Sequence, residues 1–219
     1  MRHLASLLTI TTLTLSLTSC FIVNKPAVGE VVERTITITE TPVALAIQGG
    51  ADVIVDSTLP EGEIRVKTHT DIFDILDICV EDGTLNIRQK SYDLRAKTLE
   101  VRIPHYDYSV IATSGGSDFE WDNCNVESLV IATSGGADIE ISGHCKQLTV
   151  AASGGADLDL EELIAECVEV SISGGADAGV HATNSLTINA SGGADIYYTG
   201  NPSTTDINTS GGASVSRND

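Results

Sequence analysis

A five-residue phrase, Ser-Gly-Gly-Ala-Asp, returns at a nearly fixed interval through the second half of this 219-residue chain. Its first copy has Ser in place of Ala, and its last copy lacks the acid. The copies begin at Ser114, Ser134, Ser153, Ser173, Ser191 and Ser210. A fixed interval of about 20 residues is typical of repeat architectures, in which each repeat buries its apolar face only against its neighbours.

Apolar and polar residues alternate around every copy of the phrase. The residue three before the Ser is always Ile or Val, and the residue three after it is always Ser or Ala. Residues five and seven after the Ser are apolar except for Arg217, whereas the Asp position is polar throughout. This period of two predicts strands on both sides of the paired glycines, which permit a sharp corner because they lack a Cβ atom.

Parallel stacking of the repeats, one per coil, would give each copy the same surroundings. A coil of about 19 residues at about 3.3 Å per residue traces a loop of roughly 60 Å, and successive coils would rise by about 4.8 Å. The sequence therefore predicts an all-β parallel β-helix with Ile stacked on Ile and Ala on Ala. The alternative is an antiparallel β-sandwich, although that fold would not place like residues beside like.

The first half of the chain carries a weaker form of the same pattern. Residues 43–55 repeat it with Gln48 in the Ser place, and the distance from Gln48 to Ser114 is close to three coils. We therefore expect intervening coils that lack the glycine corner. The prediction is one β-helix domain over residues 31–215, in which residues 31–110 form less regular coils and residues 111–215 regular ones.

Local signals refine this first half. Asp82-Gly83 is a strong hairpin signal, and residues 99–104 indicate a strand that ends at Pro104. Residues 71–76 are expected to form one short helical turn.

The N-terminus has the features of a secretion signal. Residues 1–19 contain a short basic start and an apolar stretch that is too short to span a bilayer. The following Leu17-Thr18-Ser19-Cys20 resembles a bacterial lipobox, which predicts lipidation of Cys20 and a tether over residues 20–30. The alternative is an ordinary signal peptide that is cut nearby. Lipidation would place the protein at the cell envelope, on the outer membrane, facing the periplasm or the cell surface.

The charge limits the classes of partner. The formal net charge is −19, and removal of residues 1–19 with Arg2 makes it −20. Nucleic-acid binding needs a basic surface and is therefore not expected. A strongly acidic body favours cations or a basic partner instead.

The order of these motifs resembles that of a known family. Asp82-Gly83-Thr84-Leu85-Asn86-Ile87, then Val101-Arg102-Ile103-Pro104, then the serial phrases from 114 to 214 follow a lipobox. This layout is similar to the auto-transporter adhesin head (GIN) domain family of Bacteroidetes-type lipoproteins, over roughly residues 30–215. The resemblance implies a right-handed single-stranded parallel β-helix at the cell envelope and no established activity.

The acids of the phrases form one predicted row. Stacked carboxylates about 4.8 Å apart repel each other, by roughly 1 kcal/mol even in water-like surroundings. They must therefore be solvated, bonded to the amides of their turns, or bridged by cations such as Ca²⁺. The candidate calcium ligands are Asp118, Asp138, Asp157, Asp177 and Asp195.

Cysteines and aromatic residues offer two further candidates. Cys124, Cys145 and Cys167 recur nearly once per coil, which suits either a buried thiol ladder or a disulfide between coils. His144 and Cys145 should point to opposite faces of a strand. Trp121, Tyr197 and Tyr198 could form part of a sugar-stacking surface or could fill the core.

The predicted function is that of a non-enzymatic envelope scaffold, adhesin-like, which contacts a glycan or an envelope protein. The alternative is a carbohydrate-active β-helix enzyme, either a polysaccharide lyase or a glycosidase. Such an enzyme needs a distinct cluster of acids with a basic partner, whereas Lys146 and Arg217 are the only Lys or Arg residues after Arg102. No catalytic residues are predicted, and no cofactor motif is visible.

Overall fold

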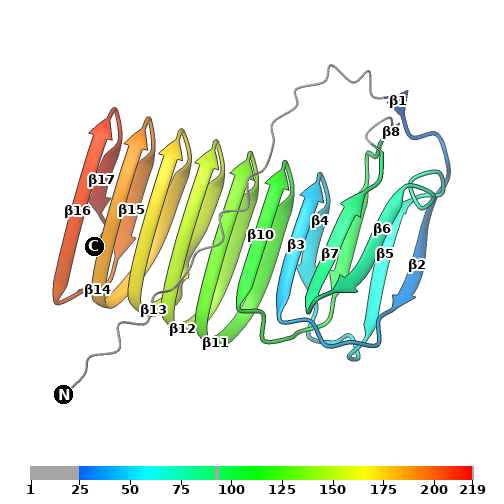
Figure 1. Cartoon of the computed structure of the whole chain (residues 1–219), viewed down its shortest axis with the longest axis horizontal. Coiled ribbons are helices and arrows are strands. Elements are labelled where there is room, and N and C mark those ends of the chain that lie inside the picture. Colours follow the sequence, from blue (N-terminus) through cyan, green and yellow to red (C-terminus); the bar gives the residue numbers. More distant parts are fainter. Residues whose placement is uncertain (1–24, 92–93, 219) are drawn as a thin grey trace.

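The computed structural model describes residues 25–91 and 94–218, which form a single all-β solenoid (Figure 1). Its strands are β1 (Lys25–Pro26), β2 (Val31–Thr37), β3 (Ala44–Gly49), β4 (Asp52–Val55), β5 (Glu63–His69), β6 (Leu76–Glu81), β7 (Thr84–Gln89), β8 (Leu94–Arg95), β9 (Leu99–Ile103), β10 (Val110–Gly115), β11 (Asp118–Gly135), β12 (Asp138–Gly154), β13 (Asp157–Gly174), β14 (Asp177–Gly192), β15 (Asp195–Thr199), β16 (Thr204–Gly211) and β17 (Ser214–Arg217).

Like residues lie beside like on adjacent parallel strands, as the repeat predicts. Ser114 pairs with Ser134, Ser134 with Ser153, and Ser153 with Ser173. The pairing is parallel from β10 through β14 and continues from β14 to β15 and β16, so the predicted parallel β-helix is confirmed and the antiparallel sandwich is wrong. Each long strand starts just after one Gly-Gly corner, bends at the opposite corner of the coil and ends at the next Gly-Gly corner (Figure 1).

The interior is filled by the rows that the alternation predicts. Ile111, Ile131, Val150, Val170 and Ile188 are each 0% exposed, and they stack rung upon rung. The positions three, five and seven after the Ser are likewise buried from the Ser114 coil to the Ser173 coil. Complete removal of this apolar surface from water is the main source of stability in such a fold.

The backbone conformation and packing of the Gly-Gly corner require glycine at its first position. The first glycine of each pair has a positive φ, for example 121° at Gly135 and 122° at Gly174. A Cβ atom on Gly174 would lie 2.5 Å from the carbonyl oxygen of Gly154 in the coil below. The corners therefore stack more closely than any side chain would allow.

We predicted further coils in the stack between Gln48 and Ser114, and this prediction was wrong. β3 pairs directly with β10, and Gln48 lies opposite Ser114. Residues 56–109 instead leave the stack and cover its far side, where β7 pairs with β3 and β9 with β4 in parallel. Three strands then close this end by antiparallel pairing, because β6 joins β7, β5 joins β9, and β2 joins β5.

Three local predictions in this region are confirmed. The hairpin at Asp82-Gly83 is confirmed, with φ of 50° and 74° between β6 and β7. β9 ends at Ile103 before Pro104, also as predicted. Residues 71–76 form one hydrogen-bonded turn, as predicted, in which the amides of Ile75 and Leu76 donate to the Ile72 carbonyl at 3.0 and 2.9 Å.

The later part of the predicted tether is held on the domain. β1 pairs with β8, Ala27 is buried, and the Val28 amide donates to the Asp71 carboxylate at 2.9 Å. Cys20 and the predicted signal peptide lie outside the described residues. Across the ranges that the structure describes, no helix is long and apolar enough to cross a membrane.

Candidate functional site

The acid of each phrase points outward on one side of the solenoid, directly after the Gly-Gly corner. Asp118, Asp138, Asp157, Asp177 and Asp195 are paired in register along β11 to β15, so the predicted row exists. Asp52 of β4 precedes Asp118 in the same row. A second row lies two residues further along and contains Glu120, Glu140 and Asp159. We call these nine residues the acidic face.

The acidic face is hollowed over its first four coils. A concavity of about 460 Å³ is lined by carboxylates from both rows, namely Asp52, Asp118, Glu120, Asp138, Glu140, Asp157 and Asp159. Val53, Ile54, Phe119 and Ile139 complete the lining. The lining therefore offers hydrogen-bond acceptors in a regular array and no basic side chain.

Burial and mutual repulsion raise the pKa values of three acids in this face. Burial raises the pKa of Asp118, and the neighbouring Asp138 raises it further. Burial likewise raises the pKa of Asp157, with Asp138 and Asp177 adding to the effect. The pKa of Asp52 is raised by burial, then by Asp118 and Glu100. Folding thus brings these carboxylates together at an electrostatic cost, which a cationic ligand would relieve.

Hydrogen bonds satisfy part of the row toward its C-terminal end. Asp177 accepts a bond from the amide of Asp195 in the next coil at 3.3 Å, and Asp195 accepts one from the Ser214 hydroxyl. These donors belong to the next coil, whereas the prediction was bonding to the amides of the same turn. Calcium binding by the row stays a prediction. In the described part of the chain, no group of three or more His, Cys, Asp or Glu side chains is arranged to hold a metal ion.

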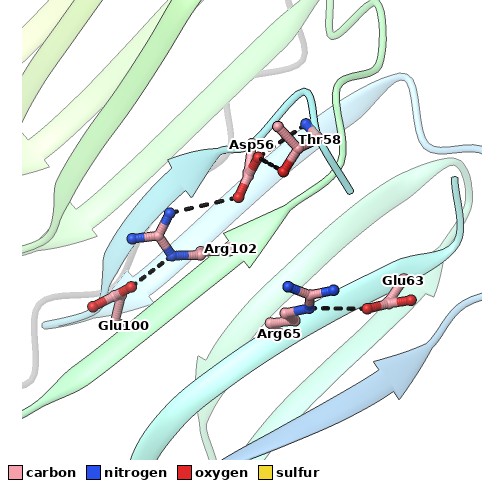
Figure 2. A network of polar contacts seen from close by, with 6 residues as sticks. All are labelled: Asp56, Thr58, Glu63, Arg65, Glu100 and Arg102. Carbon is pink, nitrogen blue, oxygen red and sulfur yellow. Dashed lines mark hydrogen bonds and ion pairs between the residues drawn. The ribbon is translucent and has the colours of Figure 1, made fainter. Parts of the chain in front are cut away.

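Basic side chains neutralise acids at the N-terminal end of the solenoid. The row of acids continues from Asp52 to Glu100 on β9, and Arg102 donates to Glu100 at 2.7 Å and to Asp56 at 3.5 Å (Figure 2). Bonds from Thr58, with the help of Arg102, lower the pKa of Asp56. On the neighbouring β5, Arg65 pairs with Glu63 at 2.9 Å (Figure 2). The acidic face is therefore left uncompensated only along the regular coils.

The opposite sheet presents a second, chemically different surface. Its outward positions carry small side chains, which leave a shallow concavity of about 520 Å³. We call this surface the small-residue face, and its members are Ala46, Gln48, Ala112, Ser114, Ala132, Ser134, Ala151, Ser153, Ser171 and Ser173. It lacks charged groups, so it could contact a ligand only through hydroxyls, methyl groups and main chain.

A third surface surrounds His144 and Cys145 at the other corner of the coil. His144 is exposed and Cys145 is buried, so they face opposite ways as predicted. Lys146 forms an ion pair with Glu127 of the preceding coil. Across residues 103–216 this lysine is the only Lys or Arg, and it serves here to neutralise its neighbours.

The cysteines do not form the continuous ladder that their spacing suggested. Cys124 lies opposite Gly143, and Cys145 lies opposite Ala165, because the register shifts at this corner. Cys124 and Cys145 are buried free thiols, and Cys167 is a half-buried one. Burial raises the pKa of Cys124 to about 12 and that of Cys145 to about 11, which keeps both protonated and unreactive at neutral pH.

Residues 42–202 match the family model described as "Putative auto-transporter adhesin, head GIN domain". The chain belongs to this family. A comparison with curated protein sequences finds no match.

Solved structures share the GIN-domain fold. A putative adhesin from Bacteroides fragilis superposes with a TM-score of 0.66 at 19% identity, covering 89% of this chain and 100% of that one. A putative adhesin from Parabacteroides merdae gives 0.53 at 15%, covering 90% and 99%. A putative lipid binding protein from Parabacteroides distasonis gives 0.53 at 19%, covering 90% and 100%. At these identities the likeness establishes the fold alone.

The aromatic candidates of this GIN domain are mostly unavailable to a ligand. Trp121 is 0% exposed and contacts Tyr108 edge to face at a ring distance of 5.8 Å, so it fills the core near the N-terminal end. Tyr198 is half-buried, whereas Tyr197 is 42% exposed. Sequence reasoning also left Asp52 out of the acid row, although Gly49-Gly50-Ala51-Asp52 carried the signal.

Proposed function

We propose that this protein is a non-enzymatic, adhesin-like scaffold of the cell envelope, whose acidic face binds a basic or neutral partner. The family and two of the three structural neighbours described above are named as adhesins, the third is named as a lipid binding protein, and none of these names describes an enzyme. The observation that carries the proposal is the regularity of the surface. The same carboxylate recurs in six successive coils at a spacing fixed by the sheet, which suits an extended ligand rather than one reacting bond.

The charge of the acidic face narrows the class of ligand. Seven carboxylates around one concavity repel anionic glycans, since no basic side chain lines it. They are suitable acceptors for the hydroxyl groups of a neutral glycan or for Lys and Arg side chains of an envelope protein. The raised pKa values of Asp52, Asp118 and Asp157 favour a cationic partner further, because its charge would relieve their repulsion.

Anchoring by lipidated Cys20 is part of the proposal. Only residues 21–24 separate this cysteine from β1, and residues 25–30 are held on the domain. Lipidation at Cys20 would therefore keep the N-terminal end of the solenoid close to the membrane and direct the regular coils away from it. Mass spectrometry of the mature protein would detect diacylglyceryl-modified Cys20, and an unmodified N-terminus elsewhere would refute the anchor.

The direct test is a binding screen. The chain from residue 21 to 219 contains every residue of the hydrophobic core and would be probed against neutral glycans, acidic glycans and envelope proteins, each with Ca²⁺ and with chelator. We expect binding of neutral or basic ligands that Asp138→Asn with Asp157→Asn weakens. The matched control is Glu169→Gln, an exposed acid on the other sheet of the same coils. Absence of binding in every arm would count against the proposal.

The rival function is a carbohydrate-active enzyme. It would require two or three non-repeating acids within reach of a basic group. In the described residues, the side chains of the concavity are instead repeated coil by coil and include no base. Incubation with polysaccharides and assay for new reducing ends or unsaturated products would distinguish the two, since a scaffold releases neither.

A further inference from the structure

The segment between β1 and β2 is fastened to the solenoid along its length. β1 pairs with β8, and Ala27 is buried. Residues 28–30 then make one hydrogen bond each, through their main chain, to the end of β5 and the turn after it, at 2.8–2.9 Å: Val28 to Asp71, Gly29 to His69 and Glu30 to Thr70. A Cβ atom on Gly29 would collide with the Thr70 hydroxyl. The place of Lys25 on the domain is therefore fixed.

This segment lies close to the predicted anchor. Cys20 and Lys25 are five Cα steps apart, and five steps of about 3.8 Å span at most about 19 Å. A lipid on Cys20 would therefore hold the corner at Lys25 within that distance of the bilayer surface. The corner belongs to the end of the solenoid opposite β16 (Figure 1).

The same corner exposes apolar side chains. Val28 is 88% exposed, the highest value for a large apolar side chain in the described part of the chain, and Val31 at the start of β2 is 45% exposed. Single exposed apolar residues are ordinary, but these two lie within four positions of each other, beside the anchor. Phe73, in the turn bonded to residues 28–30, is half-buried beneath the Arg34 guanidinium, which lies 4.3 Å from its ring centre. An arginine in this position can cover apolar surface and keep its charge among lipid headgroups.

Charge also separates this corner from the regular coils. Residues 25–38 carry two bases, Lys25 and Arg34, and two acids, Glu30 and Glu33, whereas residues 103–219 carry two bases and 17 acids. Anionic lipids would repel the regular coils far more than the corner. The neighbouring turn adds Asp71 and Asp74, so the corner has no positive excess, and we expect its contact with lipid to be apolar in origin.

On the basis of the lipidation proposed for Cys20, we propose that this corner docks on the bilayer that holds the anchor. Val28 and Val31 enter the boundary between headgroups and acyl chains, with Arg34 at headgroup level. Two valines bury too little apolar surface to hold a free domain on a membrane, but an anchored domain meets that membrane at a high effective concentration. Docking limits the swing of the solenoid and holds the regular coils away from the lipid.

Quenching of tryptophan fluorescence by brominated lipid tests this contact. The lipidated full-length protein, verified by mass spectrometry at Cys20, would be placed in vesicles of phosphatidylcholine with brominated acyl chains. Val31→Trp should lose at least about half of its added fluorescence, since an interfacial side chain reaches the acyl-chain boundary. Ile164→Trp is the matched control, because Ile164 is 38% exposed on β13 in the regular coils, and it should lose none. Trp121 is 0% exposed, so the parent chain supplies the background.

A second substitution tests the part played by Val28. Added to Val31→Trp, Val28→Glu should reduce the quenching at least about twofold, because a charge is costly to bury in the bilayer. Ile164→Glu in the same background should leave the quenching unchanged. Thermal unfolding of each variant by circular dichroism verifies that it is folded.

The outcomes separate docking from the anchor. An unmodified Cys20 would overturn both. A lipidated chain in which Val31→Trp is quenched no more than Ile164→Trp, or in which the quenching survives Val28→Glu, would overturn docking and leave the anchor standing. Ligand binding by the acidic face is measured on residues 21–219 without lipid and is independent of either result.

Discussion

Gln48 lies directly beside Ser114 on adjacent parallel strands, although residues 56–109 separate their coils in the sequence. The chain thus completes one coil, leaves the stack to build the closed end, and returns to the uncovered side of the coil it made first. The end of the solenoid nearest the N-terminus is consequently built from the middle of the sequence. This excursion gives the acid row a defined start at Asp52, with Glu100 and Arg102 beyond it.

The Gly-Gly corner provides a sharp test of packing between coils. Gly174→Ala would force a residue with Cβ into a φ of 122° and within 2.5 Å of a backbone oxygen. Backbone strain alone should lower the free energy of unfolding by about 1–3 kcal/mol. Gly175→Ala, one residue later, meets nothing within 4 Å and should change it by less than about 0.5 kcal/mol. Urea denaturation of both variants would check this, and equal effects would contradict the stacked corner.

The buried Ile and Val row predicts a difference between neighbouring coils. Ile188→Ala removes a side chain that is 0% exposed and should cost about 2–5 kcal/mol of unfolding free energy. Ile207→Ala affects the same row in the last coil, where the side chain is 38% exposed, and should cost less than about 2 kcal/mol. Urea denaturation of both variants would measure this difference. A larger loss at position 207 would contradict the burial described here.

The acidic face predicts an unusual dependence on pH. The pKa of Asp118 is raised above 3.8 in the folded chain, so its stabilising contribution is present below that pH and is lost as the pH rises through the folded pKa. Asp118→Asn keeps the side chain neutral and should therefore raise stability at neutral pH by up to about 1 kcal/mol. This advantage should shrink as the pH falls toward 3.8.

Asp56→Asn is the control of opposite sign. The pKa of Asp56 is lowered by Thr58 and Arg102, so its contribution is present above 3.8 and is lost as the pH falls through the folded pKa. This variant should be less stable at neutral pH. Thermal unfolding of both variants between acidic and neutral pH would measure the effects, and stabilisation by Asp56→Asn would contradict the network in Figure 2.

Salt provides a further check of the same repulsion. Screening weakens interactions between exposed charges, with a Debye length of about 10 Å at 0.1 M and about 3 Å at 1 M. Because acids are stacked along the regular coils with few bases among them, added NaCl should raise the melting temperature. The gain should be smaller in a variant that carries Asp118→Asn and Asp157→Asn. Destabilisation of the parent chain by moderate NaCl would show that ion pairs, rather than repulsion, dominate its surface.

Sequence reasoning succeeded where one residue type recurs in one environment. The Ile and Val row, the small residues after each corner and the outward Asp row all follow from a period of two within a period of about 20 residues. It failed where the period is lost. Residues 56–109 contain no repeated phrase. Their antiparallel pairing at the end of the stack could therefore not be predicted from the spacing of residues along the chain. The register shift that separates Cys124 from Cys145 was hidden for the same reason.

The position of the Gln48 coil in the stack tests the proposed coil order most directly. Spin labels carried by non-cysteine side chains at Gln48 and Ser173, both exposed, would avoid the native thiols. The structure places these positions four strand spacings apart, so pulsed electron paramagnetic resonance should give a backbone separation of about 19 Å after allowance for the labels. A separation of about 29 Å, six spacings, would mean that two further coils lie between Gln48 and Ser114, and it would contradict the fold and the continuous acidic face together.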